Sequence, residues 1–423
     1  MILIDTRPTL TSIDLANELV NIGYQIRHNV LTNDIEVIGL EKYQEDAAAI
    51  LPTKLFEFLG DTYKKASKQN IVDYLAVLAR DNAVNPPLDL ITAKPWDKKD
   101  HFPDIYRALH IPDDDALSKA LIRKWFMQGV SLLHNEYSNP FGADGVLILI
   151  GPQGAGKTSF FRKASMKDVH LFGMYFRDGQ EIDDRDKDKR RRAVTTWIAE
   201  LGEIGSTMKS DIDSLKAFIT SEYDEYRLPY GRTDKKAPRR TNLCGTANDS
   251  ADDAGYLIDP SGNRRFWTIH VKEISLELVN AIDFLQVWRQ AYHFMKKEGL
   301  HAFRLTKEEQ ELLEARNAGH MKKTKGMQEV DDILFAAISE PDKHTWTYQT
   351  TTKWKMQYDA IKNFDSGIIG RAITAAIKNN PEYAVDGQLN EKRKRQDGKT
   401  ERVRCLPSYK PNQYIPPGFR QED

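Results

Sequence analysis

A glycine-rich turn near residue 151 has the residue types that bind a nucleoside triphosphate. The segment Gly-Pro-Gln-Gly-Ala-Gly-Lys-Thr follows the apolar run 146–150 and leads into the apolar helix start at 159–164. Backbone N–H groups of such a turn can surround phosphate oxygens, while its lysine contacts the outer phosphates and its hydroxyl contacts Mg²⁺. This order predicts a P-loop, and the alternative is a flexible surface turn. The predicted nucleotide contacts are Gly151, Gly154, Gly156, Lys157, Thr158 and Ser159.

Acidic residues follow a second apolar run. Glu200 ends the stretch Thr-Thr-Trp-Ile-Ala-Glu, and Glu203 follows it three positions later. Ligands of open α/β sheets lie at the carboxyl ends of the strands, so these carboxylates could ligate Mg²⁺ together with Thr158 and orient an attacking water. Which acid has which role is left open. An ordinary strand followed by surface acids is the alternative interpretation.

Two further motifs could contact phosphates. Asn248 ends the apolar stretch 242–248, a position from which an amide can hydrogen-bond a γ-phosphate or its water. An isolated Asn is more often a turn former. Arg264 and Arg265 lie in a turn just before another apolar strand. Either could act as a finger on a phosphate, in its own subunit or in a neighbour's, or the two could be surface salt-bridge partners.

Two basic segments are candidates for nucleic-acid contact. Between the acid strand and the Asn248 strand, basic and aromatic residues alternate around a glycine turn, a pattern that suits a single-stranded backbone but is weak alone. The candidate contacts there are Lys216, Arg227, Arg232, Lys235, Lys236 and Arg239. Residues 391–404 hold seven Lys or Arg against three acids. Their candidate phosphate contacts are Lys392, Arg393, Lys394 and Arg395, and a solvated charge run is the alternative.

Bulk composition limits the protein class. The 423 residues are 40% hydrophobic and 29% charged. These values are typical of a globular protein with two or three domains. A net charge of −1 excludes a globally basic nucleic-acid binder, so any DNA contact must use local patches. Cys244 and Cys405 have no paired spacing, which argues against a disulfide framework or structural zinc. Because the chain lacks a signal segment and a long apolar run, we expect a cytoplasmic protein without membrane contact.

Hydrophobic periodicity predicts three domains. Residues 1–135 should form a helical accessory or oligomerisation domain with a short alternating piece at 34–38. Residues 136–317 should form an α/β P-loop core that ends in a helical lid, which begins with a helix over 276–298.

The last segments follow from capping residues and charge. A helix should open after Thr306 with Glu309 as its capping-box partner, and residues 318–327 have the composition of a linker. Residues 328–423 are expected to form a small winged-helix-like domain with a basic tail. In it, Ser366 would cap a helix that extends to residue 379.

The motifs, in this order, resemble the virulence-associated protein E family of phage and mobile-element replication ATPases, whose core is similar to superfamily 3 helicases of the AAA+ class. The resemblance spans about residues 80–300 and is carried by Gly-Pro-Gln-Gly-Ala-Gly-Lys-Thr, Trp-Ile-Ala-Glu-Leu-Gly-Glu, Leu-Lys-Ala-Phe with Tyr-Arg-Leu-Pro-Tyr-Gly-Arg, Gly-Thr-Ala-Asn and Gly-Asn-Arg-Arg-Phe-Trp. It implies ATP and Mg²⁺ as cofactors, Glu200 and Glu203 as Walker B acids, and Asn248 as the sensor.

The same resemblance implies a function and partners. Arg264 or Arg265 would reach across a subunit boundary, and a hairpin with Lys235 and Lys236 would point into a central DNA channel. The protein would be a hexameric, ATP-driven DNA helicase in a bacterial host, acting on single-stranded DNA and, through its C-terminal domain, on an origin duplex. A primase or host replication proteins are further expected partners.

Two features qualify this expectation. Two residues separate the acids, which are usually adjacent in superfamily 3, so their roles are left open. The segment 1–135 is too short for a primase domain and carries no paired-carboxylate motif, so we expect no priming activity. The rival interpretation is a nucleotide-switched DNA-binding or regulatory ATPase without unwinding activity. It stays open because ATPase motifs do not show whether hydrolysis is used to separate DNA strands. A small-molecule kinase is disfavoured, since no acceptor-site signature occurs.

Overall fold

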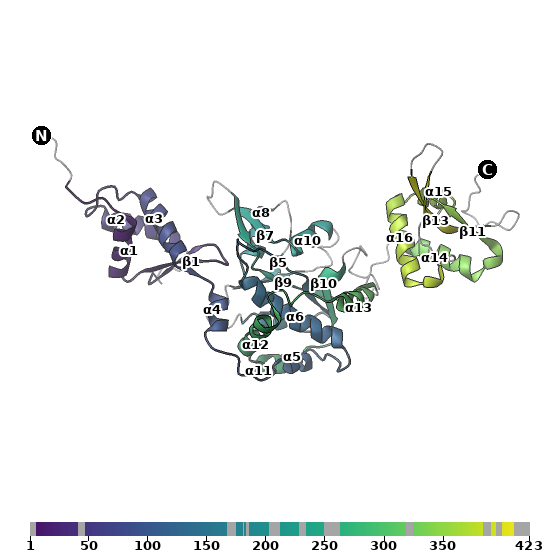
Figure 1. Ribbon diagram of the computed structural model, residues 1–423, viewed down its shortest axis with the longest axis horizontal. Helices are drawn as coiled ribbons and strands as arrows, with labels where there is room; N and C mark the ends of the chain where they lie inside the picture. Colours follow the sequence, from purple (N-terminus) through teal and green to yellow (C-terminus); the bar gives the residue numbers. More distant parts are fainter. Residues whose placement is uncertain are drawn as a thin grey trace. The chain divides into compact units, whose positions relative to one another are not determined.

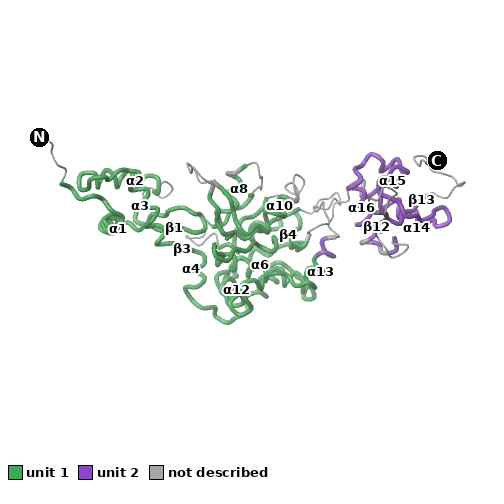
Figure 2. The backbone as a smooth tube through the Cα atoms, turned by 45° about the horizontal axis from the view of Figure 1, so that its top comes forward, with its two compact units in different colours: residues 1–249, 264–313 green, residues 250–263, 314–423 purple. Residues whose placement is uncertain are grey.

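The computed structural model divides into two compact units, which Figure 2 distinguishes by colour. Unit 1 holds residues 1–249 and 264–313, and the remaining residues form unit 2. The structure describes the chain outside residues 1–5, 41–46, 167–174, 181, 183–185, 203–211, 228–233, 249–262, 319–324, 384–390, 395–399 and 410–423.

The centre of unit 1 is a five-stranded parallel sheet in the order β10-β4-β9-β6-β5 (Figure 1). Its strands are β4 (Val146–Gly151), β5 (Phe176–Gln180), β6 (Ile198–Leu201), β9 (Asn242–Asn248) and β10 (Phe266–His270). All residues of β4 are buried, which is usual for a strand covered on both faces. The predicted α/β core is therefore confirmed, and β9 lies between the P-loop strand β4 and the acid strand β6.

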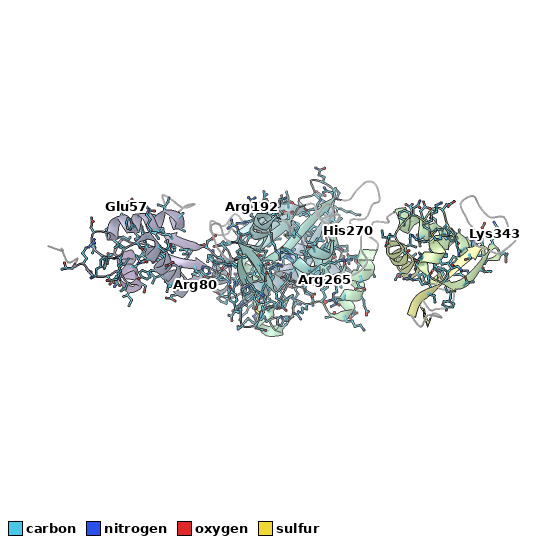
Figure 3. All side chains as sticks on the ribbon, turned by 90° about the horizontal axis from the view of Figure 1, so that it is seen from above. Glu57, Arg80, Arg192, Arg265, His270 and Lys343 are labelled. Atoms are coloured by element: carbon cyan, nitrogen blue, oxygen red, sulfur yellow. The ribbon has the colours of Figure 1, made fainter. Side chains whose placement is uncertain are left out.

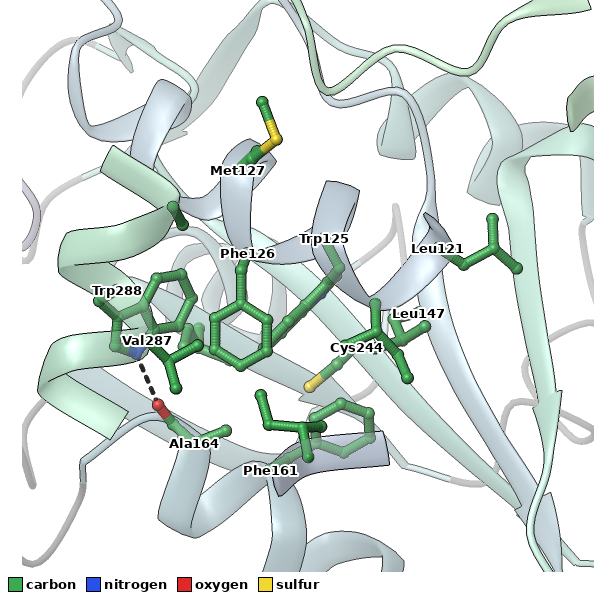
Figure 4. Packing of buried hydrophobic residues seen from close by; sticks show 14 of the residues in the cluster. Leu121, Trp125, Phe126, Met127, Leu147, Phe161, Ala164, Cys244, Val287 and Trp288 are labelled. Atoms are coloured by element: carbon green, nitrogen blue, oxygen red, sulfur yellow. Dashed lines mark hydrogen bonds between the residues drawn. The ribbon is translucent and has the colours of Figure 1, made fainter. Parts of the chain in front are cut away.

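Helices rich in aromatic residues form the core around this sheet. The main ones are α6 (Ala116–Leu133), α7 (Lys157–Ala164) and α12 (Phe284–Glu298). Figure 4 shows Trp288 of α12 against Phe126 of α6, with ring centroids 4.5 Å apart, while the indole of Trp288 donates a hydrogen bond of 2.7 Å to the carbonyl of Ala164. Burial of each such apolar side chain contributes roughly 1.5–3 kcal/mol to the stability of the fold. Together these contacts hold α7 in place after the P-loop.

The same core includes helices from the segment that precedes residue 135. They are α4 (Pro86–Thr92), α5 (Phe102–Ala108) and α6, and their apolar residues join the hydrophobic cluster that contains β4. The expected single helix over 276–298 is instead two, α11 (Leu276–Ala281) and α12. The break occurs because Asp283 caps α12, accepting a hydrogen bond from the backbone N–H of Gln286.

The N-terminal subdomain, residues 6–84, has a separate hydrophobic core. It contains α1 (Ser12–Asn21), β1 (Gln25–Asn29), β2 (Ile35–Ile38), α2 (Ala47–Leu59), α3 (Lys68–Asp81) and β3 (Ala83–Val84). The alternating piece predicted at 34–38 is β2, and it pairs antiparallel with β1. Helices α2 and α3 contact this small sheet, and α1 packs against α3, so the apolar residues of all three helices share one core.

An antiparallel hairpin projects from the region between β6 and β9. Its strands are β7 (Tyr223–Arg227) and β8 (Asp234–Pro238), and the helices α8 (Lys187–Val194) and α10 (Ile212–Ile219) precede it. A short 3₁₀ helix, η3 (Asn263–Arg265), leads into β10. Among the described residues no helix is both long and apolar enough to cross a bilayer.

Unit 2 packs helices on a three-stranded antiparallel sheet of order β11-β13-β12. Its elements are α14 (Lys325–Ser339), η4 (Pro341–Lys343), β11 (His344–Gln349), α15 (Thr351–Lys355), α16 (Ser366–Asn379), η5 (Pro381–Tyr383), β12 (Glu391–Lys394) and β13 (Thr400–Tyr409). Helix α13 (Lys307–Ala318) spans the boundary between the units.

Local capping explains where these helices begin. The N–H of Thr306 donates to the Glu309 carboxylate at 2.7 Å, and the N–H of Glu309 donates to the Thr306 hydroxyl at 3.2 Å. These reciprocal bonds confirm the predicted capping box before α13. The expectation for Ser366 was wrong. Asp365 caps α16 by accepting from two backbone N–H groups, and Ser366 is the first helical residue. Residues 325–327 belong to α14, so the predicted linker is shorter, and residues 319–324 lie outside the described chain.

Candidate nucleotide-binding site

The turn after β4 has the backbone geometry of a phosphate-binding loop. Gly156 adopts a φ of 89°, a left-handed conformation that favours glycine, and it caps α7. A side chain at Gly151 would place its Cβ 1.9 Å from the carbonyl oxygen of Val271. Gly154 also has a positive φ, and Ser159 lies in the first turn of α7. The loop therefore turns sharply into a helix whose N-terminal N–H groups face the space above it.

Lys157 is positioned across the loop by three oxygen atoms. Its ammonium donates to the carbonyls of Gly151 and Pro152, each at 2.7 Å, and to the side-chain oxygen of Asn248 at 3.1 Å. The last contact follows from the sheet register, because Gly151 of β4 pairs with Asn248 of β9. The structure thus brings together two of the residues that the sequence singled out, at the carboxyl end of neighbouring strands.

Glu200 lies on the second strand from β4 and is almost completely buried, with 2% of its surface exposed. It pairs with Cys244 in the register of β6 and β9, and alternation places Thr246 and Asn248 on the same face of β9. Its carboxylate accepts hydrogen bonds from the Thr158 hydroxyl at 2.7 Å and the Thr246 hydroxyl at 3.1 Å. Thr246, which sequence reasoning missed, therefore belongs to the site. Its position two residues before Asn248 in the same strand was the available signal.

Burial raises the pKa of the Glu200 carboxyl, although the hydrogen bonds from Thr158 and Thr246 act in the opposite direction. A cation beside this group would favour its ionised form. A threonine hydroxyl next to a carboxylate is a hard oxygen donor set, which fits Mg²⁺. Among the described residues no group of three His, Cys, Asp or Glu gathers. Glu203 lies outside the described residues.

Arg264 and Arg265 lie at the opposite edge of the sheet from the P-loop. They immediately precede β10, whose first residue Phe266 pairs with Val146, the first residue of β4. Strand β10 has five residues and therefore spans about 17 Å, which exceeds the reach of an arginine side chain. Neither guanidinium can therefore serve the nucleotide site of its own subunit, one of the two options that the sequence left open.

The two arginines also differ in exposure. Arg264 is exposed and donates to the side chain of Gln310 at 3.2 Å, whereas Arg265 is half-buried. Figure 3 labels Arg265.

Two of the residues predicted to contact DNA are buried, which corrects those predictions. Arg239 is fully buried, and its Nε donates to both oxygens of Asp224, at 2.8 and 2.7 Å. Its guanidinium also lies 4.5 Å from the ring centroid of Phe218 on α10. Lys216 has only 6% of its surface exposed. Arg239 directly follows β8, so its bonds to Asp224 of β7 stabilise the base of the β7–β8 hairpin.

The two lysines of β8 face opposite sides of the hairpin. Lys236 pairs with Glu225, and its ammonium lies 4.3 Å from the ring centroid of Tyr223 on the exposed side. Lys235 is half-buried and pairs with Tyr226 on the other side. Sequence reasoning treated these lysines as equivalent, and the strand alternation separates them.

For the remaining predicted DNA contacts, the structure gives only the strand to which each residue belongs. Arg227 ends β7, while Lys392, Arg393 and Lys394 lie in β12. Arg232 and Arg395 are outside the described residues.

A parallel α/β sheet that carries a P-loop at its carboxyl edge, with a buried acid bonded to the P-loop threonine, defines a P-loop nucleoside triphosphatase. The family model of the virulence-associated protein E-like domain matches residues 91–322, which is more than half of the chain. The protein belongs to this family. No curated protein matches the sequence.

The chain is also similar to solved structures of the NrS-1 C-terminal region. One apo structure of this region is 14% identical, covers 95% of this chain and all of that one, and gives a TM-score of 0.46. A second apo structure is also 14% identical, covers 93% of this chain and 99% of that one, and gives a TM-score of 0.44.

Proposed function

We propose that this protein is an ATP-driven DNA helicase of phage or mobile-element replication that forms a ring and translocates on single-stranded DNA. The observation that carries the proposal is the position of its charged and polar groups on one sheet. Lys157 and Asn248 lie at the carboxyl edge, and the exposed Arg264 lies at the amino edge. A head-to-tail ring places the amino edge of one subunit against the carboxyl edge of the next. Family membership supports the same proposal.

In this proposal each site residue has a distinct task in ATP hydrolysis. Lys157 leaves its carbonyl partners to hold the outer phosphates, and the Asn248 amide orients the attacking water toward the γ-phosphorus. Thr158 and Glu200 would hold Mg²⁺, which would supply positive charge beside the phosphate oxygens. Arg264 of a neighbouring subunit stabilises the charge that develops as the bond to ADP breaks. We propose Glu203 as a further acid that acts on the water.

DNA contact is proposed for the hairpin and for the C-terminal unit. Lys236 and Tyr223 present an exposed cation beside an aromatic ring, a combination that suits a single-stranded backbone. The element order of unit 2 and the basic strand β12 support a winged-helix-like domain that contacts an origin duplex. The accessory role of the N-terminal region in oligomerisation stays a prediction.

Strand displacement on a forked DNA duplex tests this function. The wild-type protein should separate the strands when ATP is present, and Lys157→Ala should show neither displacement nor ATP hydrolysis. Replacing Lys235 and Lys236 together by Ala should preserve basal hydrolysis but remove its stimulation by single-stranded DNA. A wild-type protein that hydrolyses ATP in response to DNA and leaves every fork intact would establish the rival, a nucleotide-switched regulatory ATPase.

A further inference from the structure

The N-terminal subdomain contacts the β7–β8 hairpin through the turn between β1 and β2. The side-chain amide of Asn33 donates a hydrogen bond to the hydroxyl of Tyr226 in β7. Arg240, two residues after β8, donates to the backbone carbonyl of Val30 at 3.3 Å. These contacts bring the turn directly against the side of the hairpin that carries Tyr226.

Cationic side chains from both partners gather at this contact. Lys235 pairs with Tyr226 across the hairpin and therefore lies on the same side. Arg80 is exposed in the last turn of α3, and the chain after this helix returns to β1, where the N–H of His28 donates to the carbonyl of Asn82 at 3.2 Å. Arg80 lies at the end of the subdomain that adjoins the rest of unit 1 (Figure 3).

The electrostatics of His28 agree with this gathering of cations. Burial lowers the pKa of its imidazole, and the charges of Lys235, Arg80 and Arg240 lower it further. The hydrogen bond from the Asn33 side chain acts against them. One imidazole therefore experiences the field of three cations, two from the core and one from the N-terminal subdomain.

Two carboxylates act on these cations from beyond ion-pair distance, Asp34 on Lys235 and Glu136 on Arg240. Within the part of the chain that the structure describes, no carboxylate lies at ion-pair distance from Arg80, Lys235 or Arg240. The Nε of Arg240 is buried without a hydrogen-bond partner. Asp34 and Glu136 favour the charged forms of Lys235 and Arg240, while burial lowers the pKa of both side chains. A gathering of cations without ion-pair partners is stabilised by a bound anion.

We infer that this seam, formed by Arg80, Lys235 and Arg240, binds phosphates of a single-stranded nucleic-acid backbone. The inference rests on the proposed function and adds a DNA contact from the N-terminal subdomain. Lys235 and Arg240 are half-buried, so a single phosphodiester chain can reach them more easily than a duplex. Lys236 on the other side of the hairpin then forms a separate contact, and the strand meets the protein on both sides of the hairpin.

A salt titration of DNA binding tests this inference with the full chain. The anisotropy of a labelled oligothymidylate gives the affinity at each salt concentration for wild type, Arg80→Ala and Lys68→Ala. For single strands, each lost phosphate contact reduces the slope of log K against log salt by about 0.7. Arg80→Ala should show that reduction together with weaker binding.

Lys68 is the matched control. It begins the same helix and is likewise exposed. At the rise of an α-helix, the twelve positions between it and Arg80 correspond to roughly 18 Å along the axis. Its replacement by Ala should therefore leave the salt slope unchanged.

The outcomes separate the inference from the proposed function. Equal slopes for Arg80→Ala and Lys68→Ala, with normal DNA binding by the wild type, would overturn the inference and leave the helicase proposal intact. Failure of the wild type to bind single-stranded DNA at any salt concentration would refute both. If Arg80→Ala weakened binding of inorganic tripolyphosphate and left the DNA slope unchanged, the seam would be a site for a free phosphate compound. That result would also overturn the inference. Basal ATP hydrolysis should be unchanged in both variants, which verifies their folding.

Discussion

With Arg264 as the proposed finger, the sheet geometry makes each ATP site a site that two subunits share. Lys157 and Arg264 lie at opposite edges of the sheet, separated by the length of β10, about 17 Å. We predict that Lys157→Ala and Arg264→Ala each abolish ATP hydrolysis in pure rings, for different reasons. The first removes the contact with the outer phosphates, and the second removes the charge that the neighbouring subunit receives.

Mixing the two inactive variants should restore activity of a calculable size. A productive boundary needs an intact Lys157 from one subunit and an intact Arg264 from the next. With equal amounts and random exchange, each condition holds for half of the subunits, so about a quarter of the boundaries in a head-to-tail ring are intact. The mixture should therefore recover roughly a quarter of the wild-type ATPase rate, if boundaries act independently.

The assay is steady-state phosphate release after mixing, with subunit exchange followed by fluorescence transfer between labelled chains. Arg265→Ala is the matched control, because the substitution removes a neighbouring, half-buried guanidinium. The Arg265→Ala protein should hydrolyse ATP without being mixed with a second variant. Full exchange without any recovery of hydrolysis would refute the argument that the site is shared. Recovery with Arg265→Ala but not with Arg264→Ala would assign the finger to Arg265 instead.

Two further predictions concern buried charges. Burial raises the folded-state pKa of Glu200, so the wild type loses stability as pH rises from the unfolded to the folded pKa. Glu200→Gln should abolish ATP hydrolysis. It should raise the melting temperature above that of the wild type at neutral pH, and the difference between the two melting temperatures should disappear at acidic pH. A lower melting temperature at neutral pH would contradict this. Asp224→Asn should destabilise the protein by about 3–5 kcal/mol in urea unfolding, because it leaves the Arg239 guanidinium buried and unpaired. Replacing the exposed neighbour Glu225 by Gln should change the free energy of unfolding little. Equal losses of stability in the two variants would disprove the stabilising role of the Asp224–Arg239 pair.

Local patterns correctly identified the elements that form the nucleotide site. An unbroken apolar run predicts a fully buried strand, so β4 was predictable. The glycines that follow it predict a turn whose backbone conformation or close contacts exclude a side chain, so the turn was predictable as well. The parallel arrangement then explains why Lys157 and Asn248 meet, because the carboxyl ends of such strands share one edge. Thr246 was overlooked because its only signal was its position two residues before Asn248 in the same strand, which predicts the face of the sheet but not the contact with Glu200.

Charged residues around the hairpin were the least predictable part of the site. Lys216 and Arg239 have the composition of a solvent-facing surface, yet both are buried, and Asp224 pairs with Arg239. Lys235 and Lys236 are adjacent in sequence but differ in surroundings, because one faces the N-terminal subdomain and the other faces solvent. Such differences depend on contacts between segments that are far apart along the chain.

The sequence alone determined the strands, the P-loop and the family, because these depend on residue type and spacing over short distances. Only the tertiary structure decided which charges are exposed and at which end of the sheet each one lies. The edge that carries Arg264, the burial of Arg239 and the cations at the seam all result from strand order and packing, which bring together residues that no local pattern connects.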